Sequence, residues 1–93
     1  ICQNDDMAMG ALEAVEAAGR KDKIIVIGID AIEDAKQAVK DGRLDCTVFQ
    51  DAAGQGAGSV DVALECAKAG TIEHDDVMIP FVLITKDNID QFM

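Results

Sequence analysis

The sequence is poor in aromatic residues, with three Phe and neither Tyr nor Trp in 93 residues. A hydrophobic core must therefore be built from aliphatic side chains. The chain is 49% hydrophobic, which is enough to form such a core and excludes a disordered tail. The length suits at most one small domain.

Basic residues are also scarce. The chain has 8 Lys and Arg but 18 Asp and Glu, which gives a net charge of −10. Such a surface repels phosphate backbones and anionic lipids, so we expect neither nucleic acid nor a membrane surface as a partner. The longest apolar run, at 24–29, is far too short to cross a bilayer.

Three cysteines, Cys2, Cys46 and Cys66, form no CxxC motif and no cluster with His at metal-ligand spacing. We expect buried free thiols, with a Cys2–Cys46 disulfide between neighbouring strands as the alternative. The single histidine, His74, stands in the polar stretch EHDD, where a solvated loop is the ordinary interpretation and a metal ligand the alternative. No nucleophile–base pair is visible, so we expect neither an enzyme nor a cofactor.

Strand patterns alternate with helix patterns along the chain. The β-branched apolar stretches 23–29, 45–50 and 77–85 predict strands, and residues 1–3 resemble the end of a fourth. Pro80 cannot donate to a ladder, so the last stretch must bend, lie at an edge or change partner there.

Three stretches have apolar residues at helical spacing and end at glycine. The predicted helices cover 6–18, 32–42 and 59–70, with narrow stripes at Ala8, Leu12 and Val15, at Ile32, Ala35 and Val39, and at Val60, Ala63 and Ala67. The β-α-β-α-β-α-β order predicts an α/β fold: a three-layer parallel sheet with right-handed crossovers, like part of a Rossmann or flavodoxin-like lobe.

A polar residue follows each of the first three predicted strands: Asn4, Asp30 and Gln50. In open α/β sheets, ligands bind in the crevice outside the carboxyl ends of the strands. A carboxylate accepts hydroxyl protons, and amides both donate and accept, so this set suits the hydroxyls of a polyol and repels phosphate. The alternative is helix capping, by Asp5 or Asp6 for the first helix and by Asp30 for the second.

The stretch QNDDMAMGALEAVEAAGRKDKIIVIGIDAIEDAKQAVKDGRLDCTVFQD resembles the ligand-binding lobe of type I periplasmic sugar-binding proteins, the ribose-binding group of ABC-transporter receptors. The family pattern runs from QND.MA.GA through GFD and TV.Q to a closing strand and TK.N, with Ile29 here in place of the usual Phe. The resemblance covers nearly all of the chain. It implies that Asn4, Asp30 and Gln50 contact the hydroxyls of a monosaccharide, with Gln50 at a hinge crossing.

The resemblance also implies the setting of the chain. Residues 1–93 form a single partial domain, a C-terminal fragment of a two-lobed receptor, in which 51–76 pack on the other lobe and 77–85 return through the hinge. The partners expected of the intact protein are a monosaccharide and a membrane ABC permease. Its expected location is the periplasm, or the cell surface with a lipoprotein anchor. Exposed sheet edges in the fragment suggest a homodimer.

Three other functions remain open at the level of sequence. Sensor domains of the lactose-repressor type share this fold and much of the pattern. The stretch GQGAGS at 54–59 is similar to a dinucleotide-binding loop, but Ser59 replaces its third glycine. Asp5 and Asp6, with Lys86 after the last strand, resemble the acidic cluster of a phosphoacceptor domain, at the wrong spacing.

Overall fold

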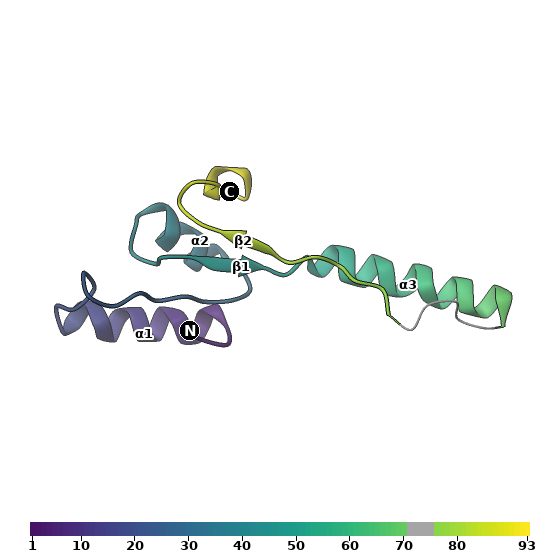
Figure 1. Cartoon of the computed structure of the whole chain (residues 1–93), viewed down its shortest axis with the longest axis horizontal. Coiled ribbons are helices and arrows are strands. Elements are labelled where there is room, and N and C mark those ends of the chain that lie inside the picture. The colour runs from purple at the N-terminus through teal and green to yellow at the C-terminus, as the bar shows by residue number, and fades with distance from the viewer. Residues whose placement is uncertain (71–75) are drawn as a thin grey trace. The chain divides into compact units, whose positions relative to one another are not determined.

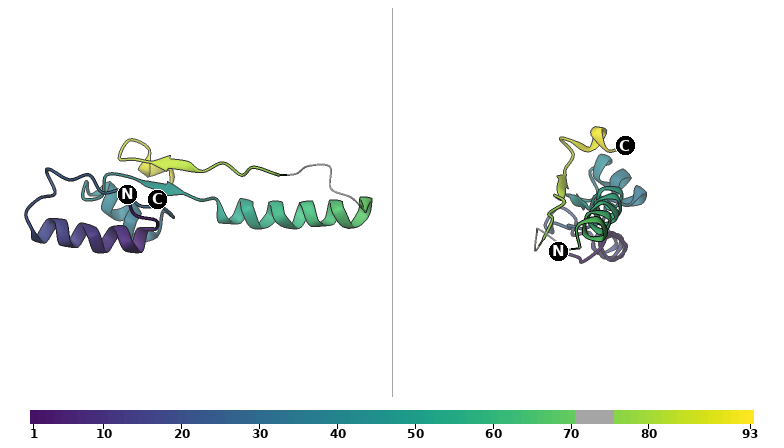
Figure 2. Two further views of the ribbon diagram at one scale, coloured as in Figure 1. Left: turned by 60° about the horizontal axis from the view of Figure 1, so that its bottom comes forward. Right: turned by 90° about the vertical axis from the view of Figure 1, so that its right-hand side faces the viewer.

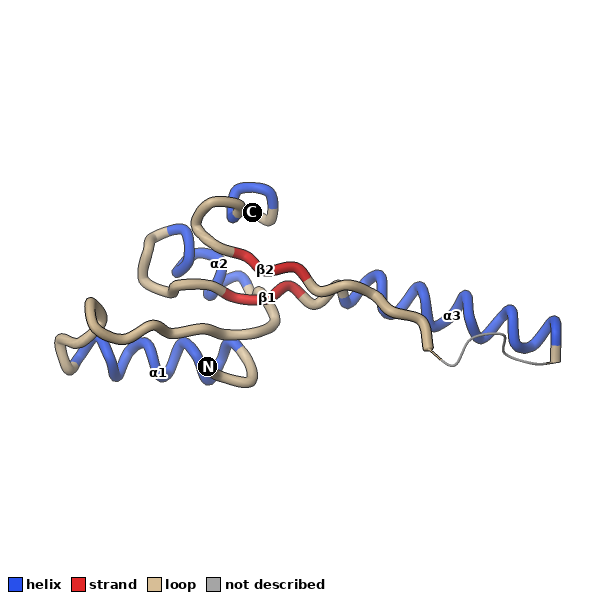
Figure 3. Tube along the Cα trace, viewed as in Figure 1, coloured by secondary structure: helices blue, strands red, loops and turns tan. Residues whose placement is uncertain are grey.

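The computed structural model describes residues 1–70 and 76–93, which form two compact units. Unit 1 comprises Ile1–Gln50 with Val82–Met93, and unit 2 comprises Asp51–Phe81. The elements in chain order are α1 (Asp5–Ala17), α2 (Glu33–Lys40), β1 (Thr47–Phe49), α3 (Ala52–Ala69), β2 (Val82–Ile84) and the short 3₁₀ helix η1 (Ile89–Gln91) (Figures 1 and 3).

Helix α1 confirms the helix predicted at 6–18. Asn4 caps it, because its side-chain oxygen accepts the backbone N–H of Met7 at 2.9 Å. Ala8 and Leu12 of the predicted stripe are fully buried. Gly19 adopts a φ of 69°, which lets the chain reverse after the helix. The following segment runs back beside α1 (Figures 1 and 2).

Helix α2 falls within the range predicted at 32–42 and buries two residues of the expected stripe, Ala35 and Val39, while Ile32 precedes the helix and is half-buried. A surface ion pair links the end of α1 to the loop that follows α2. The Arg43 guanidinium donates two hydrogen bonds to the Glu16 carboxylate, at 3.1 and 2.7 Å. This fork geometry fixes the loop after α2 against the last turn of α1.

The predicted second strand, at 23–29, is extended but pairs with residues 46–49 only in places. Ile27 forms a parallel bridge with Cys46, and Asp30 forms another with Phe49. Between them, the Asp30 N–H donates to the carbonyl of Val48 at 2.9 Å. The parallel direction agrees with the predicted crossover through α2.

The extended segment 24–30 lies between the two cysteines that the sequence offered as a disulfide. The N–H of Cys2 bonds to the carbonyl of Ile27 at 2.8 Å, and Ile27 pairs on its other side with Cys46. Two strand spacings place the cysteines about 9.5 Å apart, beyond disulfide reach. All three cysteines are free, and the alternative of a Cys2–Cys46 bridge is wrong.

The last predicted strand is shorter than expected and runs the other way. Of 77–85 only Val82–Ile84 form a strand, β2, and it pairs antiparallel to β1, with Thr47 opposite Ile84. Pro80 lies before the paired residues, as a residue without an N–H must. Asn88 then closes the turn into η1, accepting the Thr85 N–H and donating to the Leu83 carbonyl.

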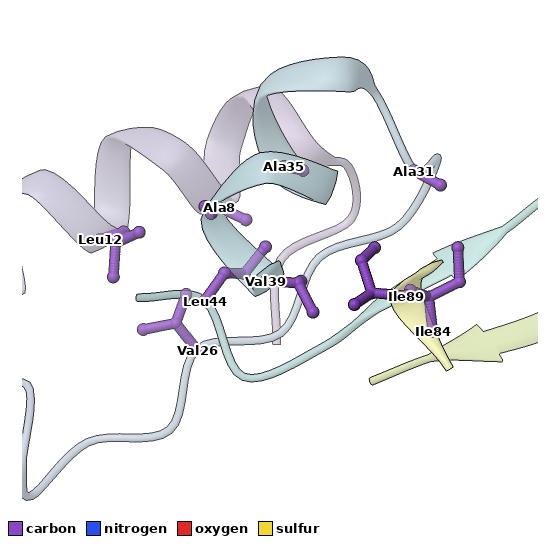
Figure 4. Close-up of a cluster of buried hydrophobic side chains, with 10 residues drawn as sticks. Ala8, Leu12, Val26, Ala31, Ala35, Val39, Leu44, Ile84 and Ile89 are labelled. Carbon is purple, nitrogen blue, oxygen red and sulfur yellow. The ribbon is translucent and has the colours of Figure 1, made fainter. Parts of the chain in front are cut away.

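The core of unit 1 lies where α1 and α2 meet one face of the paired strands (Figure 4). Its buried apolar residues are Ala8, Leu12, Val26, Ala31, Ala35, Ala38, Val39, Leu44, Ile84 and Ile89. Side chains alternate along strands, so the opposite face carries the neighbours of these residues. There Ile25 is 72% exposed and Leu83 is 55% exposed. The α/β class is confirmed, and within the described residues of unit 1 the helices cover one face of the sheet.

Unit 2 contains α3, which begins seven residues before the predicted start at 59. The predicted start at 59 is too late, because Asp51 caps the helix by accepting the Gly54 N–H at 2.9 Å. A Cβ at Gly54 would overlap the Asp51 carboxylate, which explains that glycine. The stripe at Val60, Ala63 and Ala67 is not buried. No helix in the described part of the chain is long and apolar enough to span a bilayer.

Candidate functional site

The structure brings two of the three candidate residues into direct contact. The side-chain amide of Gln50 donates a 2.6 Å hydrogen bond to Oδ1 of Asp30. The parallel bridge between Asp30 and Phe49 causes this contact, because it sets the last residue of the extended segment beside the end of β1. Asp30 is exposed and Gln50 is half-buried, so both side chains remain accessible at this edge.

The backbone that carries Asp30 is strained. Asp30 has a φ of 124° and its neighbour Ala31 a φ of 60°, a region that residues other than glycine rarely enter. Such conformations persist only where the surroundings over-determine them, and they cluster at functional sites. The loop from Asp30 to Ile32, hereafter the strained loop, joins the extended segment to α2.

Asn4 makes no side-chain hydrogen bond to Asp30 or Gln50. Its side-chain oxygen caps α1, so the capping role that the sequence analysis considered for Asp5 or Asp6 belongs to Asn4. The next residue, Asp5, accepts the N–H of Ile32 at 3.0 Å, which places the start of α1 against the strained loop. Asp30 does not cap α2: the capping residue is Ile32, which makes no side-chain cap bond.

The hydrogen bonds at this edge fix what each side chain can offer a ligand. The oxygen of Asn4 faces the Met7 N–H, so its NH₂ group remains to donate. The NH₂ group of Gln50 faces Asp30, so its oxygen remains to accept. Asp30 has acceptor capacity beyond the one bond to Gln50. The edge therefore offers amide donors from Asn4 and Gln50 and acceptors from Asp30 and Gln50, which suits neighbouring hydroxyl groups.

A fourth residue, Asp5, belongs to the support of this edge, and the sequence analysis missed it. Its carboxylate is fully buried. Oδ1 accepts the hydroxyl of Thr47 at 2.7 Å, and Oδ2 accepts the Ile32 N–H. The missed signal was spacing: Asp5, Ala8 and Leu12 stand at i, i+3 and i+7, so Asp5 continues the buried stripe of α1.

The ring nearest to Gln50 in sequence, Phe49, is engaged by the protein itself. Phe49 and Phe92 lie with ring centroids 5.6 Å apart at 54°, a tilted aromatic pair. Both are partly buried against the core. The Phe49 ring therefore packs against Phe92, the residue after η1, and is not free to contact a ligand at this edge.

The phosphoacceptor and metal alternatives find no support among residues 1–70 and 76–93. The carboxylate of Asp5 is occupied by Thr47 and Ile32. Lys86 approaches Gly42, just past the end of α2, because β2 runs antiparallel. These described residues hold no cluster of three or more His, Cys, Asp or Glu that could bind a metal ion. His74 lies outside them.

Comparison with known proteins gives consistent matches over the whole chain. The chain is 50% identical, over 99% of its length, to a putative rhizopine-binding protein of Rhizobium meliloti. It is 41% identical, over 91% of its length, to the D-ribose/D-allose-binding protein of Pseudomonas aeruginosa. It resembles the crystal structure of an ABC transporter solute binding protein from Bacillus halodurans with bound myo-inositol, with a TM-score of 0.77, 50% identity and 96% of the chain covered.

The chain spans about a third of these proteins: 30% of the Rhizobium protein, 28% of the Pseudomonas protein and 30% of the Bacillus structure. The family model of the periplasmic binding protein domain matches residues 1–71. This chain belongs to the periplasmic binding protein family.

Proposed function

We propose that the chain is part of an extracytoplasmic solute-binding component of a sugar ABC transporter. The observation that carries this proposal is the hydrogen-bonded pair of Asp30 and Gln50 at the end of the paired strands. The relatives support it, because they are named as binding proteins and the Bacillus structure contains bound myo-inositol. The role is binding rather than catalysis.

The ligand is a polyhydroxylated ring, a monosaccharide or a cyclic polyol of the same size. Two neighbouring hydroxyls donate to Asp30 and Gln50, and a third oxygen accepts from Asn4. A hydrogen bond to a charged group contributes about 1.5–3 kcal/mol and a neutral one about 1 kcal/mol, so Asp30 contributes most. A phosphorylated ring is excluded, since its charge would face that carboxylate.

Binding between two lobes that close around the ligand follows from the proposed family role. The division of the chain into units supports the predicted crossings, because it falls at Gln50–Asp51 and at Phe81–Val82. Helix α3 buries none of its side chains among the described residues. It is therefore suited to pack on protein outside this chain, as predicted for 51–76.

The remaining partners follow from the same proposal. The intact receptor delivers its ligand to a membrane permease, from the periplasm or from a lipid anchor at the cell surface. The chain alone associates with a second copy through the uncovered sheet face and edges. The lactose-repressor alternative has no support from the relatives, which are binding proteins.

The test is a two-dimensional NMR titration of the ¹⁵N-labelled chain with myo-inositol, D-ribose and D-allose. One partial lobe cannot enclose a ligand, so we expect dissociation constants of about 1 mM or weaker. Saturable shifts should concentrate at Asn4, Asp30 and Gln50. An inositol monophosphate serves as the control ligand and should produce no such shifts.

Two outcomes would contradict the proposal. The absence of saturable shifts at all three residues, with every sugar up to about 100 mM, would remove the site. Micromolar binding by the chain alone, measured by titration calorimetry, would contradict the two-lobed arrangement.

A further inference from the structure

The buried carboxylate of Asp5 connects three segments that are distant in sequence. It sits in the first turn of α1 and is bonded to Thr47 of β1 and to Ile32 at the start of α2. The Thr47 hydroxyl in turn accepts the N–H of Ala31 at 3.3 Å. The carboxylate and the hydroxyl together hold consecutive backbone N–H groups of the strained loop.

Helix α2 makes this contact unusual. In a capping box, the backbone N–H of the capping residue donates to a Glu or Gln side chain three positions later. In α2 that position is Ala35, and the capping residue Ile32 provides no side-chain cap. Asp5 supplies the missing carboxylate from another helix. Its negative charge is favourable there, since it stands at the N-terminal ends of both α1 and α2.

Gly28 makes room for this arrangement. A Cβ at that position would overlap the Asp5 carboxylate and crowd the Cβ of Ala8. The extended segment can therefore pass directly over Asp5 only because residue 28 is glycine. The same segment carries Asp30 two residues later.

We infer that Asp5 is a positioning residue, which acts with Thr47 to hold Asp30 and Ala31 in their strained conformation so that the Asp30 carboxylate meets Gln50. The hydrogen bonds fall at Ala31 and Ile32, directly after the residue they position. That this positioning serves to bind a polyol rests on the proposed function. The positioning of the loop itself does not depend on it.

The primary test compares Asp5→Asn with Asp6→Asn. Asn keeps the shape of Asp5 but replaces one of its two acceptors with a donor, and Asp6 is exposed in the same turn and loses the same charge. The readouts are the three-bond HN–Hα couplings of Asp30 and Ala31, which depend on φ, and the hydrogen exchange rate of the Ile32 N–H. We expect Asp5→Asn to shift both couplings and to speed that exchange about tenfold beyond any change in global stability.

A rescue separates positioning from simple packing. Glycine enters positive φ without a steric cost, so Ala31→Gly in the Asp5→Asn background should restore the HN–Hα coupling of Asp30. A residue that only filled the core would not be rescued in this way. If Asp5→Asn does not fold, Thr47→Val removes the same hydroxyl link at constant shape, and the same couplings are measured.

The inference is overturned if Asp5→Asn and Asp6→Asn give the same couplings and exchange rates, or if the Ile32 exchange changes only in proportion to global stability. All these measurements are made without ligand. If Asp5→Asn shifts the couplings of the loop but the parent chain binds no sugar, the inference about Asp5 holds and the proposed function fails. If Asp5→Asn leaves the loop unchanged but the parent chain binds sugar, the inference fails and the proposed function holds.

Discussion

The amide of Gln50 donates a 2.6 Å hydrogen bond to the carboxylate of Asp30, although twenty residues separate them in the chain. The bond turns the oxygen of Gln50 away from Asp30 and gives the edge of the sheet its acceptor character. It also ties the residue that directly follows β1 to the strained loop. Disturbing either residue should therefore affect ligand recognition more than folding.

Asp30→Asn should weaken binding of myo-inositol or a monosaccharide about tenfold, because a charged acceptor becomes a neutral one. The change is measured by the NMR titration described above. Asp34→Asn, which removes the same charge from an exposed position in the first turn of α2, is the control and should leave binding unchanged. Equal weakening by both variants would show that net charge, rather than contact, governs the affinity.

Leu12→Ala should lower the free energy of unfolding by about 2–5 kcal/mol, because it leaves a cavity among fully buried side chains. Leu64→Ala makes the same substitution on α3, where the side chain is 52% exposed, and should change stability by about 0.5 kcal/mol or less. Urea denaturation of the chain measures both. Similar losses would mean that α3 packs more tightly in solution than its exposure indicates.

The carboxyl group of Asp45 should make the free energy of unfolding of unit 1 depend on pH. Burial alone would raise its pKa, but the Val26 N–H and the Lys21 ammonium hold that pKa below its ordinary value. A pKa that is lower in the folded state stabilises the fold above the unfolded pKa and loses that effect as pH falls through the folded one. The pair is partly exposed, so the loss should be about 1 kcal/mol or less.

Urea unfolding of Asp45→Asn at neutral pH and at about pH 3 measures this effect. The variant should be less stable than the parent at neutral pH, and the difference should shrink in acid. Asp22→Asn is the control, because it removes the same charge from an exposed position of the preceding turn. A difference that is independent of pH would contradict the assignment.

The uncovered sheet face should drive self-association of the chain. Ile25 and Leu83 are exposed there, and contiguous exposed apolar surface favours association. Light scattering after size exclusion should find a dimer at high protein concentration, and Leu83→Lys should shift it to monomer. Val60→Lys, which places the same charge on an exposed apolar position of α3, is the control and should leave the dimer in place. A parent chain that stays monomeric would contradict the prediction.

Local patterns predicted the helices of unit 1 well, because their burial repeats at helical spacing. Ala8 and Leu12 in α1, and Ala35 and Val39 in α2, are buried as that spacing requires. The bridge from Asp30 to Phe49 agrees with the parallel pairing expected of a crossover through α2. The predicted parallel pairing is the reason why the sequence groups Asp30 with Gln50.

Other features depend on contacts that no local pattern contains. The antiparallel direction of β2 is set by pairing with β1 and by Asn88 in the following turn, and an apolar run carries no sign of direction. The early start of α3 depends on the cap from Asp51, which offsets the low helix propensity of the glycines that follow. The positive φ of Asp30 had no signal, since it does not fall on a glycine.

The two connections between the units leave unit 1 side by side, because Phe49, the residue before the boundary at Gln50, is opposite Val82 in the ladder of β1 and β2. A single covalent tether would allow one body to swivel freely about it. Two tethers anchored side by side resist twisting and leave bending across the pair as the easier movement. Any movement of unit 2 relative to unit 1 should therefore be guided by two adjacent stretches of chain rather than by one.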